Sequence, residues 1–173
     1  HCVSHSGDLF FEHCYGPDIP KFVTLLGRFG GSALKLSDRF LSSPSKDAFD
    51  HVAVNMLAMA ACYSPNPKSA LGFDLPFDLK TGELLPKVWA RWKQLDPVVV
   101  AGRSRAALKR LTTLYFDCGV RDEYYLHLGA RKLSQVLKKM DVRHTYEEHE
   151  FGHYDMAPRY DVSLSMLSRR LVA

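Results

Sequence analysis

A chain of 173 residues that is 46% hydrophobic and 24% charged has the composition of an ordinary globular protein and enough length for a domain with a hydrophobic core. Its net charge of +4 is modest. Its two basic segments, residues 102–110 and 131–139, have the apolar spacing of solvated helices, so we expect no nucleic-acid partner. The longest apolar stretch, residues 53–62, is too short to cross a bilayer, which argues against a membrane partner.

The cysteines favour a reducing compartment. None of the four belongs to a C-x-x-C pair, and no signal peptide is visible, so we expect free, buried thiols and a cytoplasmic location. The chain opens on "HCVSHSGD" without a methionine, which is typical of an internal segment of a fold.

The first half of the chain predicts a short strand and two helices. The strand lies at the N-terminus and is followed by a tight turn at Ser6-Gly7-Asp8. One helix begins near Pro20 and ends at Gly30-Gly31, and a longer one runs from Ser45, its expected N-cap, to Ala61.

The composition of the sequence changes at residues 63–95. Four prolines interrupt regular structure between residues 65 and 86, and "FDLKTGELL" indicates a small hairpin. We expect a Pro-rich excursion over a surface or a pocket rim, followed by a short helix with Trp89 and Trp92 as core residues.

The last third predicts strand, helix, strand, helix. Residues 111–118 form an apolar and β-branched run typical of a strand that is buried on both faces. A helix follows over residues 123–140, a strand with period-two alternation over 142–148, and a final helix extends to Leu171. This order predicts an α/β fold with two parallel strands joined by a crossover.

Parallel strands end at the same edge of a sheet, so the loops that follow them are neighbours. The first of these loops carries Asp122 and the second carries His153. Asp122 is expected to accept a hydrogen bond from one ring nitrogen of His153, which leaves the other nitrogen free to act as a base. Two plainer roles stay open, because Asp122 also suits the N-cap of the next helix and His153 suits a solvated loop. Asp117 and Glu123 are competitors for the acid.

The stretch "HEFGH" at residues 149–153 also matches the zinc-peptidase pattern H-E-x-x-H. That pattern binds metal only on a helix, which stacks His149 and His153 on one face and leaves Glu150 to activate water. The residues upstream predict a strand, and Pro158 opposes a helix that continues from His149. No third ligand follows at the usual spacing, so a zinc hydrolase is the weaker alternative and we expect no metal.

"LYFDCGVRDEYYLHLGARKLSQVLKKMDVRHTYEEHEFGHYDMAPRY" resembles the C-terminal part of the esterase D-like family of α/β hydrolases, and "SHSGDLFFEHCYGPDIP" resembles the family's segment after strand six. The resemblance implies that residues 1–173 are the C-terminal part of one α/β-hydrolase domain. It implies a serine-type carboxylic ester or thioester hydrolase without a cofactor, in which Asp122 and His153 are the acid and histidine of a triad. Ser6, Asp8 and Tyr154 are expected to line the substrate.

The chain departs from the family at the nucleophile. The family carries its serine in a G-x-S-x-G elbow, and this sequence has none, since "GGSAL" at residues 30–34 lacks the last glycine. We therefore expect the nucleophile upstream of His1, with Ser6 a poorly suited replacement, and the isolated chain inactive. A missing N-terminal half or a second copy is expected to cover the open sheet edge. A non-catalytic interaction module of the same fold is the main alternative.

Overall fold

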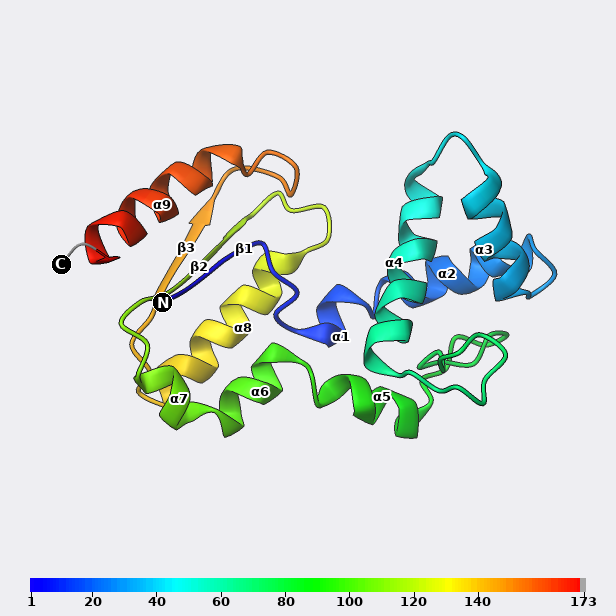
Figure 1. Ribbon diagram of the computed structural model, residues 1–173, viewed down its shortest axis with the longest axis horizontal. Coiled ribbons are helices and arrows are strands. Elements are labelled where there is room, and N and C mark those ends of the chain that lie inside the picture. The colour runs from blue at the N-terminus through cyan, green and yellow to red at the C-terminus, as the bar shows by residue number, and fades with distance from the viewer. Residues whose placement is uncertain (172–173) are drawn as a thin grey trace. The chain divides into compact units, whose positions relative to one another are not determined.

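The structure, a computed structural model, describes residues 1–171 apart from the side chains of residues 48 and 49 (Figure 1). The chain divides into two compact units. One consists of His1–Cys14 and the chain from Asp96 onward, and the other of Tyr15–Leu95. The sequence predicted one domain in which a Pro-rich segment, residues 63–95, extends over the surface. The second unit begins earlier because the helices before residue 63 pack on one another instead of on the sheet.

The first unit contains a three-stranded parallel sheet in the order β1-β2-β3, which confirms the predicted α/β class and the parallel pairing. Its strands are β1 (Cys2–His5), β2 (Leu114–Gly119) and β3 (Thr145–His149). Residues 115–118 of the central strand are all buried, as its continuous apolar run predicted. Among the described residues, β1 and β3 are the edge strands of this sheet, and neither pairs with a further strand.

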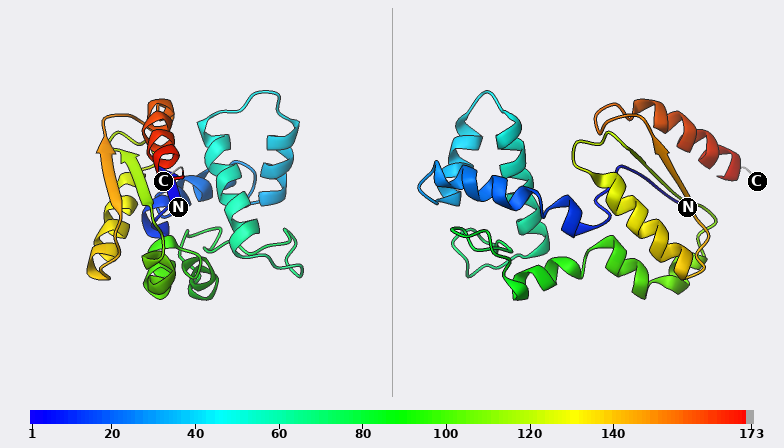
Figure 2. Two further views of the ribbon diagram at one scale, coloured as in Figure 1. Left: turned by 60° about the vertical axis from the view of Figure 1, so that its left-hand side comes forward. Right: turned by 180° about the vertical axis from the view of Figure 1, so that it is seen from behind.

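Helices lie on both faces of this sheet (Figure 2). Helix α8 (Leu126–Lys139) packs on β2 and β3 through its apolar face, and α1 (Phe11–Cys14) and α6 (Pro97–Arg103) pack on α8. Helix α7 (Arg105–Lys109) follows α6 after a break at Ser104.

Helix α9 (Ala157–Leu171) lies on the opposite face and is attached differently. Its buried residue is a serine, Ser163, whereas Leu164 and Leu171 on the same helix are exposed. Polar contacts from Arg159 and Ser163 to the sheet therefore hold this helix, in place of an apolar stripe.

The second unit has its own core of large buried side chains. Helix α2 (Asp18–Gly27) packs on α4 (Ala48–Tyr63), and α3 (Ala33–Ser42) and α5 (Pro86–Lys93) complete the unit. The fully buried core residues are Tyr15, Phe22, Leu26, Leu36, Met56, Phe77 and Trp92. Phe77 pairs with Leu84 across the small hairpin that the sequence predicted.

One expectation for this unit was wrong, and one of its helices was missed. Helix α4 is capped by Asp47, not by Ser45, because Asp47 and Asp50 exchange hydrogen bonds with each other's backbone N–H groups in a capping box. Helix α3 was not predicted, although Ser32 caps it by accepting a hydrogen bond from Lys35 N.

Two further expectations concern the burial of the cysteines and the absence of a membrane-spanning helix. All four cysteines are free thiols, but only Cys14 and Cys118 are buried, whereas Cys2 and Cys62 are exposed. Within residues 1–171, none of the helices is both long enough and apolar enough to cross a membrane.

Candidate active site: a buried aspartate and a loop histidine

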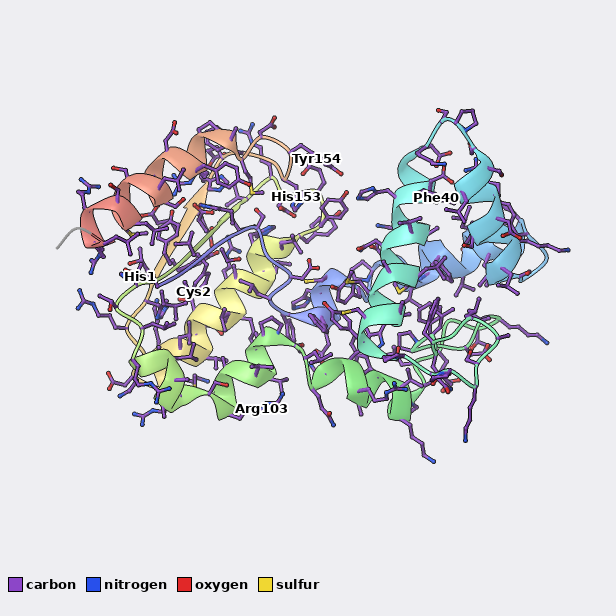
Figure 3. All side chains as sticks on the ribbon, in the orientation of Figure 1. His1, Cys2, Phe40, Arg103, His153 and Tyr154 are labelled. Atoms are coloured by element: carbon purple, nitrogen blue, oxygen red, sulfur yellow. The ribbon has the colours of Figure 1, made fainter. Side chains whose placement is uncertain are left out.

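The loops that follow β2 and β3 are neighbours, as the parallel topology predicted. Val120 N, directly after β2, donates a 2.8 Å hydrogen bond to the carbonyl oxygen of His149, the last residue of β3. Figure 3 shows His153 at the end of the sheet opposite to His1 and Cys2, where β1 begins. The first unit thus brings both loops to the carboxyl edge of its sheet.

Asp122 is buried, and each of its two oxygens has its own role. Oδ1 accepts hydrogen bonds from Tyr124 N at 3.0 Å, in the loop before α8, and from Leu126 N at 3.2 Å, at the first residue of α8. Oδ2 lies 3.0 Å from Nδ1 of His153. Asp122 is not the N-cap that the sequence offered as an alternative, because α8 begins only at Leu126 and Tyr125 holds the N-cap position. Its side chain nevertheless contacts both the first N–H of this helix and His153.

The contact with Asp122 fixes the tautomer of His153. An ionised carboxylate can only accept hydrogen bonds, so Nδ1 of His153 carries the proton and Nε2 of the neutral ring keeps a lone pair. The His153 side chain is 30% exposed and the Asp122 side chain is 0% exposed. The imidazole of His153 is thus partly exposed and can act as a base, while the buried carboxylate of Asp122 keeps the ring in place.

Glu123 positions the loop that carries the histidine. Its Oε2 accepts a 2.7 Å hydrogen bond from the backbone N–H of His153. Gly152 makes room for it, since a Cβ atom at Gly152 would lie 2.7 Å from Glu123 Oε1. A Cβ at Gly119 would lie 1.8 Å from the carbonyl oxygen of Phe151, so the two loops approach more closely than side chains would allow. The sequence offered Glu123 as a competing acid, but it contacts the backbone of His153 instead of its ring.

The three residues expected to line the substrate have different surroundings. Tyr154 is 68% exposed, and its ring lies 5.5 Å from that of His153. Asp8 is exposed on the turn after β1. Ser6 is buried, has a φ of 43°, and places its hydroxyl 3.3 Å from Cys118 Sγ, which in turn lies 3.8 Å from Asp122 Oδ2. Ser6 is therefore linked to Asp122 through Cys118, and its side chain is not open to solvent.

A pocket of about 700 Å³ adjoins the histidine loop. Charged and aromatic side chains share its lining, among them Arg121, Glu123, Phe151 and Tyr154. The pocket lies along the histidine loop, next to Gly152 and Tyr154, and the His153 side chain is not part of its lining.

The "HEFGH" stretch does not have the conformation that a zinc site of this pattern requires. Strand β3 ends at His149, and residues 150–153 form a loop instead of a helix. His149 is turned toward Asp117, 3.9 Å from its carboxylate, and burial lowers the pKa of this histidine. Glu150 is exposed and pairs with Arg121. Among residues 1–171, no three His, Cys, Asp or Glu side chains are grouped to hold a metal ion.

A second polar cluster, under α9, was not predicted. Asp117 accepts hydrogen bonds from His5 Nδ1 and Tyr115 OH, both at 2.7 Å, and from Arg159 Nε at 2.8 Å. Burial alone would raise the pKa of Asp117, but the hydrogen bonds from Tyr115, His5 and Arg159 more than offset this, so its pKa lies below the usual value.

This cluster has the residue types of a triad, since His5 Nε2 lies 2.9 Å from Ser163 Oγ. However, Ser163 is only 2% exposed, and Arg159 already neutralises Asp117. The cluster therefore attaches α9 to the sheet. The one sequence signal for it was an acidic residue, Asp117, inside an apolar strand.

Comparison of the sequence with models of known protein families and with curated proteins gave no match. The resemblance to the esterase D-like family therefore stays a prediction.

Proposed function

We propose that the unit carrying β1–β3 is the C-terminal part of an α/β-hydrolase fold and that the protein is a serine-type hydrolase of carboxylic esters or thioesters. The observation that carries this proposal is the 3.0 Å contact between the buried Asp122 carboxylate and Nδ1 of His153, which leaves Nε2 free. The Asp-before-His order at the carboxyl edge of parallel strands supports it as well.

In this mechanism Nε2 of His153 takes the proton of a serine hydroxyl as the serine oxygen bonds to the ester carbonyl carbon. His153 then returns that proton to the leaving alcohol or thiol, and an acyl-serine remains. Water, deprotonated by the same nitrogen, attacks the acyl carbon and releases the acid and the serine. Asp122 keeps Nδ1 protonated and stabilises the imidazolium that forms in each step.

The nucleophile is the part that these 173 residues do not supply in the expected motif. We assign it to a serine outside them, on a segment that extends the sheet beyond β1. A second copy of the chain at that edge is the alternative partner. The substrate is a small ester or thioester, and the chemistry needs no cofactor.

The test is covalent labelling of the full-length protein with a fluorophosphonate, which reacts with activated serines. Wild-type protein should be labelled, and His153→Ala should abolish labelling. Glu150→Gln is the matched control: Glu150 is exposed and would activate water in a zinc site, but it has no role in the serine mechanism.

Labelling that survives His153→Ala would contradict the proposal. A folded full-length protein that no fluorophosphonate labels would also contradict it and would favour the interaction module. Esterase activity that chelators abolish and that Glu150→Gln eliminates would favour the zinc alternative.

A further inference from the structure

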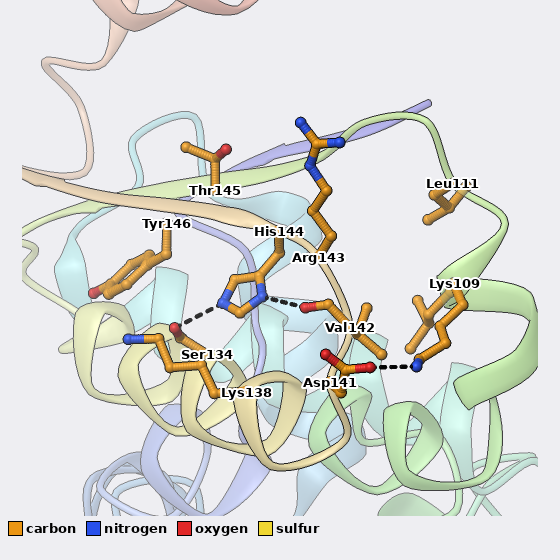
Figure 4. Close-up of a pocket in the computed structure, with 11 residues that line it drawn as sticks. Lys109, Leu111, Ser134, Lys138, Asp141, Val142, Arg143, His144, Thr145 and Tyr146 are labelled. Atoms are coloured by element: carbon orange, nitrogen blue, oxygen red, sulfur yellow. Dashed lines mark hydrogen bonds and ion pairs between the residues drawn. The ribbon is translucent and has the colours of Figure 1, made fainter.

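The two basic segments of the sequence meet at a pocket far from the histidine loop. The pocket measures about 840 Å³ and lies between α7, the C-terminal half of α8 and the chain that enters β3 (Figure 4). It is at the amino end of β3, whereas Asp122 and His153 lie at the carboxyl ends of the strands. The pocket is therefore separate from the proposed hydrolase site.

The walls of this pocket are tied together by hydrogen bonds. Lys109 on α7 pairs with Asp141 at 2.6 Å, and Arg105 Nε donates to the carbonyl oxygen of Met140 at 2.7 Å. Both contacts join α7 to the turn between α8 and β3. The pocket is thus built by fixed elements and does not depend on loose side chains for its shape.

A preorganised pair lies inside it. His144 Nδ1 donates to the carbonyl oxygen of Val142 at 2.8 Å, because a carbonyl can only accept. Nε2 of the neutral ring therefore accepts from the hydroxyl of Ser134, at 2.9 Å. Ser134 is buried on α8, and Figure 4 shows the Ser134 oxygen and the end of Lys138 on the same side of the helix.

The charge around this pair is positive. Three cations line the pocket, Lys109, Lys138 and Arg143, against one carboxylate, Asp141, which Lys109 already neutralises. Among the described residues, neither Lys138 nor Arg143 has an ion-pair partner. Figure 4 shows Arg143 on the other side of the strand from His144, so Arg143 adds to the positive field, and Lys138 is placed for direct contact.

We propose that this pocket binds a small phosphate monoester. Two uncompensated cations match the charge of a phosphate monoester, which is about −2 near neutral pH, better than that of a carboxylate. When both ring nitrogens of His144 carry a proton, Nε2 donates to Ser134 Oγ, and the Ser134 hydroxyl can donate a hydrogen bond to the ligand. Leu108, Leu111 and Val142 provide an apolar wall for the organic group.

The experiment is titration of the protein, followed by backbone amide NMR, with three probes: inorganic phosphate, phenyl phosphate and benzoate. Phenyl phosphate should cause saturable shifts at residues 134–146 and bind more tightly than inorganic phosphate, because its ring contacts the apolar wall. Benzoate should bind more weakly than phenyl phosphate.

The matched variants are neighbours on α8. Lys138→Ala should weaken phenyl phosphate binding about tenfold, because it removes a charge-assisted contact. Lys139 does not line the pocket, so Lys139→Ala should leave the affinity unchanged. Ser134→Ala should weaken binding as well, and the amide spectrum of each variant shows whether it is folded.

Three results would overturn the proposal. The first is the absence of saturable shifts at residues 134–146 with millimolar phenyl phosphate. The second is an equal loss of affinity in Lys138→Ala and Lys139→Ala, which would indicate unspecific attraction by a basic helix end. The third is benzoate binding as tightly as phenyl phosphate, which would exclude phosphate recognition. None of these results depends on the hydrolase proposal.

Discussion

At the residue scale, Asp122 combines two roles that are usually weighed against each other. One oxygen accepts from the first backbone N–H of α8 and the other contacts the histidine ring, so the same buried side chain supports the start of a helix and fixes the tautomer of His153. The hydrogen bonds from Tyr124 N and Leu126 N also hold the carboxylate in position. The two roles can be separated by the choice of substitution.

Asp122→Asn should separate them. The amide oxygen of asparagine can accept the same hydrogen bonds from Tyr124 N and Leu126 N, so the free energy of unfolding should change by less than about 1 kcal/mol. The amide, however, cannot hold Nδ1 of His153 protonated through a charged partner, so labelling of the full-length protein by a fluorophosphonate should slow by about a thousandfold or more. Urea unfolding measures the first effect. Labelling at the wild-type rate in Asp122→Asn would show that the carboxylate has no role in holding His153.

At the element scale, α9 depends on one arginine. Arg159 Nε contacts the buried carboxylate of Asp117, and its guanidinium also contacts Tyr115 OH and Glu147. Arg159→Met keeps the aliphatic stem but leaves Asp117 buried with its charge less compensated. This should lower the free energy of unfolding by about 3 kcal/mol.

Amide hydrogen exchange in α9 measures this effect and should accelerate in Arg159→Met. Arg169→Met is the control, because Arg169 lies exposed on the same helix. It should change stability by less than about 0.5 kcal/mol. Equal protection of α9 in wild type and Arg159→Met would mean that apolar contacts hold this helix instead.

The pairing of α8 with β3 should depend on pH. Hydrogen bonds from Arg131, at 2.6 and 2.7 Å, lower the pKa of Glu148 from 4.5 to about 2. A carboxyl group whose pKa is lower in the folded state adds stability above its unfolded pKa and loses it as pH falls through the folded value. Wild type should therefore be more stable than Glu148→Gln above pH 4.5, and the difference should vanish toward pH 2. A difference that stays constant from pH 6 to about pH 2 would contradict this assignment.

The elements with strong periodicity were predictable, whereas polar contacts between distant residues were not. The apolar run of β2 and the apolar face of α8 predicted both elements to within a few residues, because burial against neighbours determined their pattern. The pairing of Asp122 with His153 followed from strand direction alone. Helix α9 was predicted, but its polar attachment was not, because Arg159 and Asp117 are 42 residues apart and no local pattern links them.

At the scale of the whole molecule, the chain forms two compact units with separate cores. The sequence indicated the prolines of residues 63–95 but not the unit boundary, because the boundary depends on which helices pack together. The packing of α2 on α4 is a tertiary contact, and amphipathic spacing within each helix cannot specify which helix it packs on.

Separate cores predict separate responses to core truncation. Phe22 is 0% exposed and its ring lies 5.6 Å from that of Phe77, so Phe22→Ala should destabilise the second unit by about 3–5 kcal/mol. Amide exchange should accelerate in α2 and α4 and stay unchanged in β2 and β3. Leu137→Ala, in the buried face of α8, should give the reverse pattern. Uniform acceleration in both variants would show that the chain unfolds as one cooperative unit.

The central claim is that a buried carboxylate fixes the histidine as a base, and nitrogen NMR of the ring of His153 tests it most directly. The ¹⁵N chemical shifts of the two ring nitrogens report which one carries the proton in the neutral ring. We predict a proton on Nδ1, lost from that position in Asp122→Asn and retained in Glu150→Gln. A neutral His153 ring with its proton on Nε2 in the wild-type protein would contradict it.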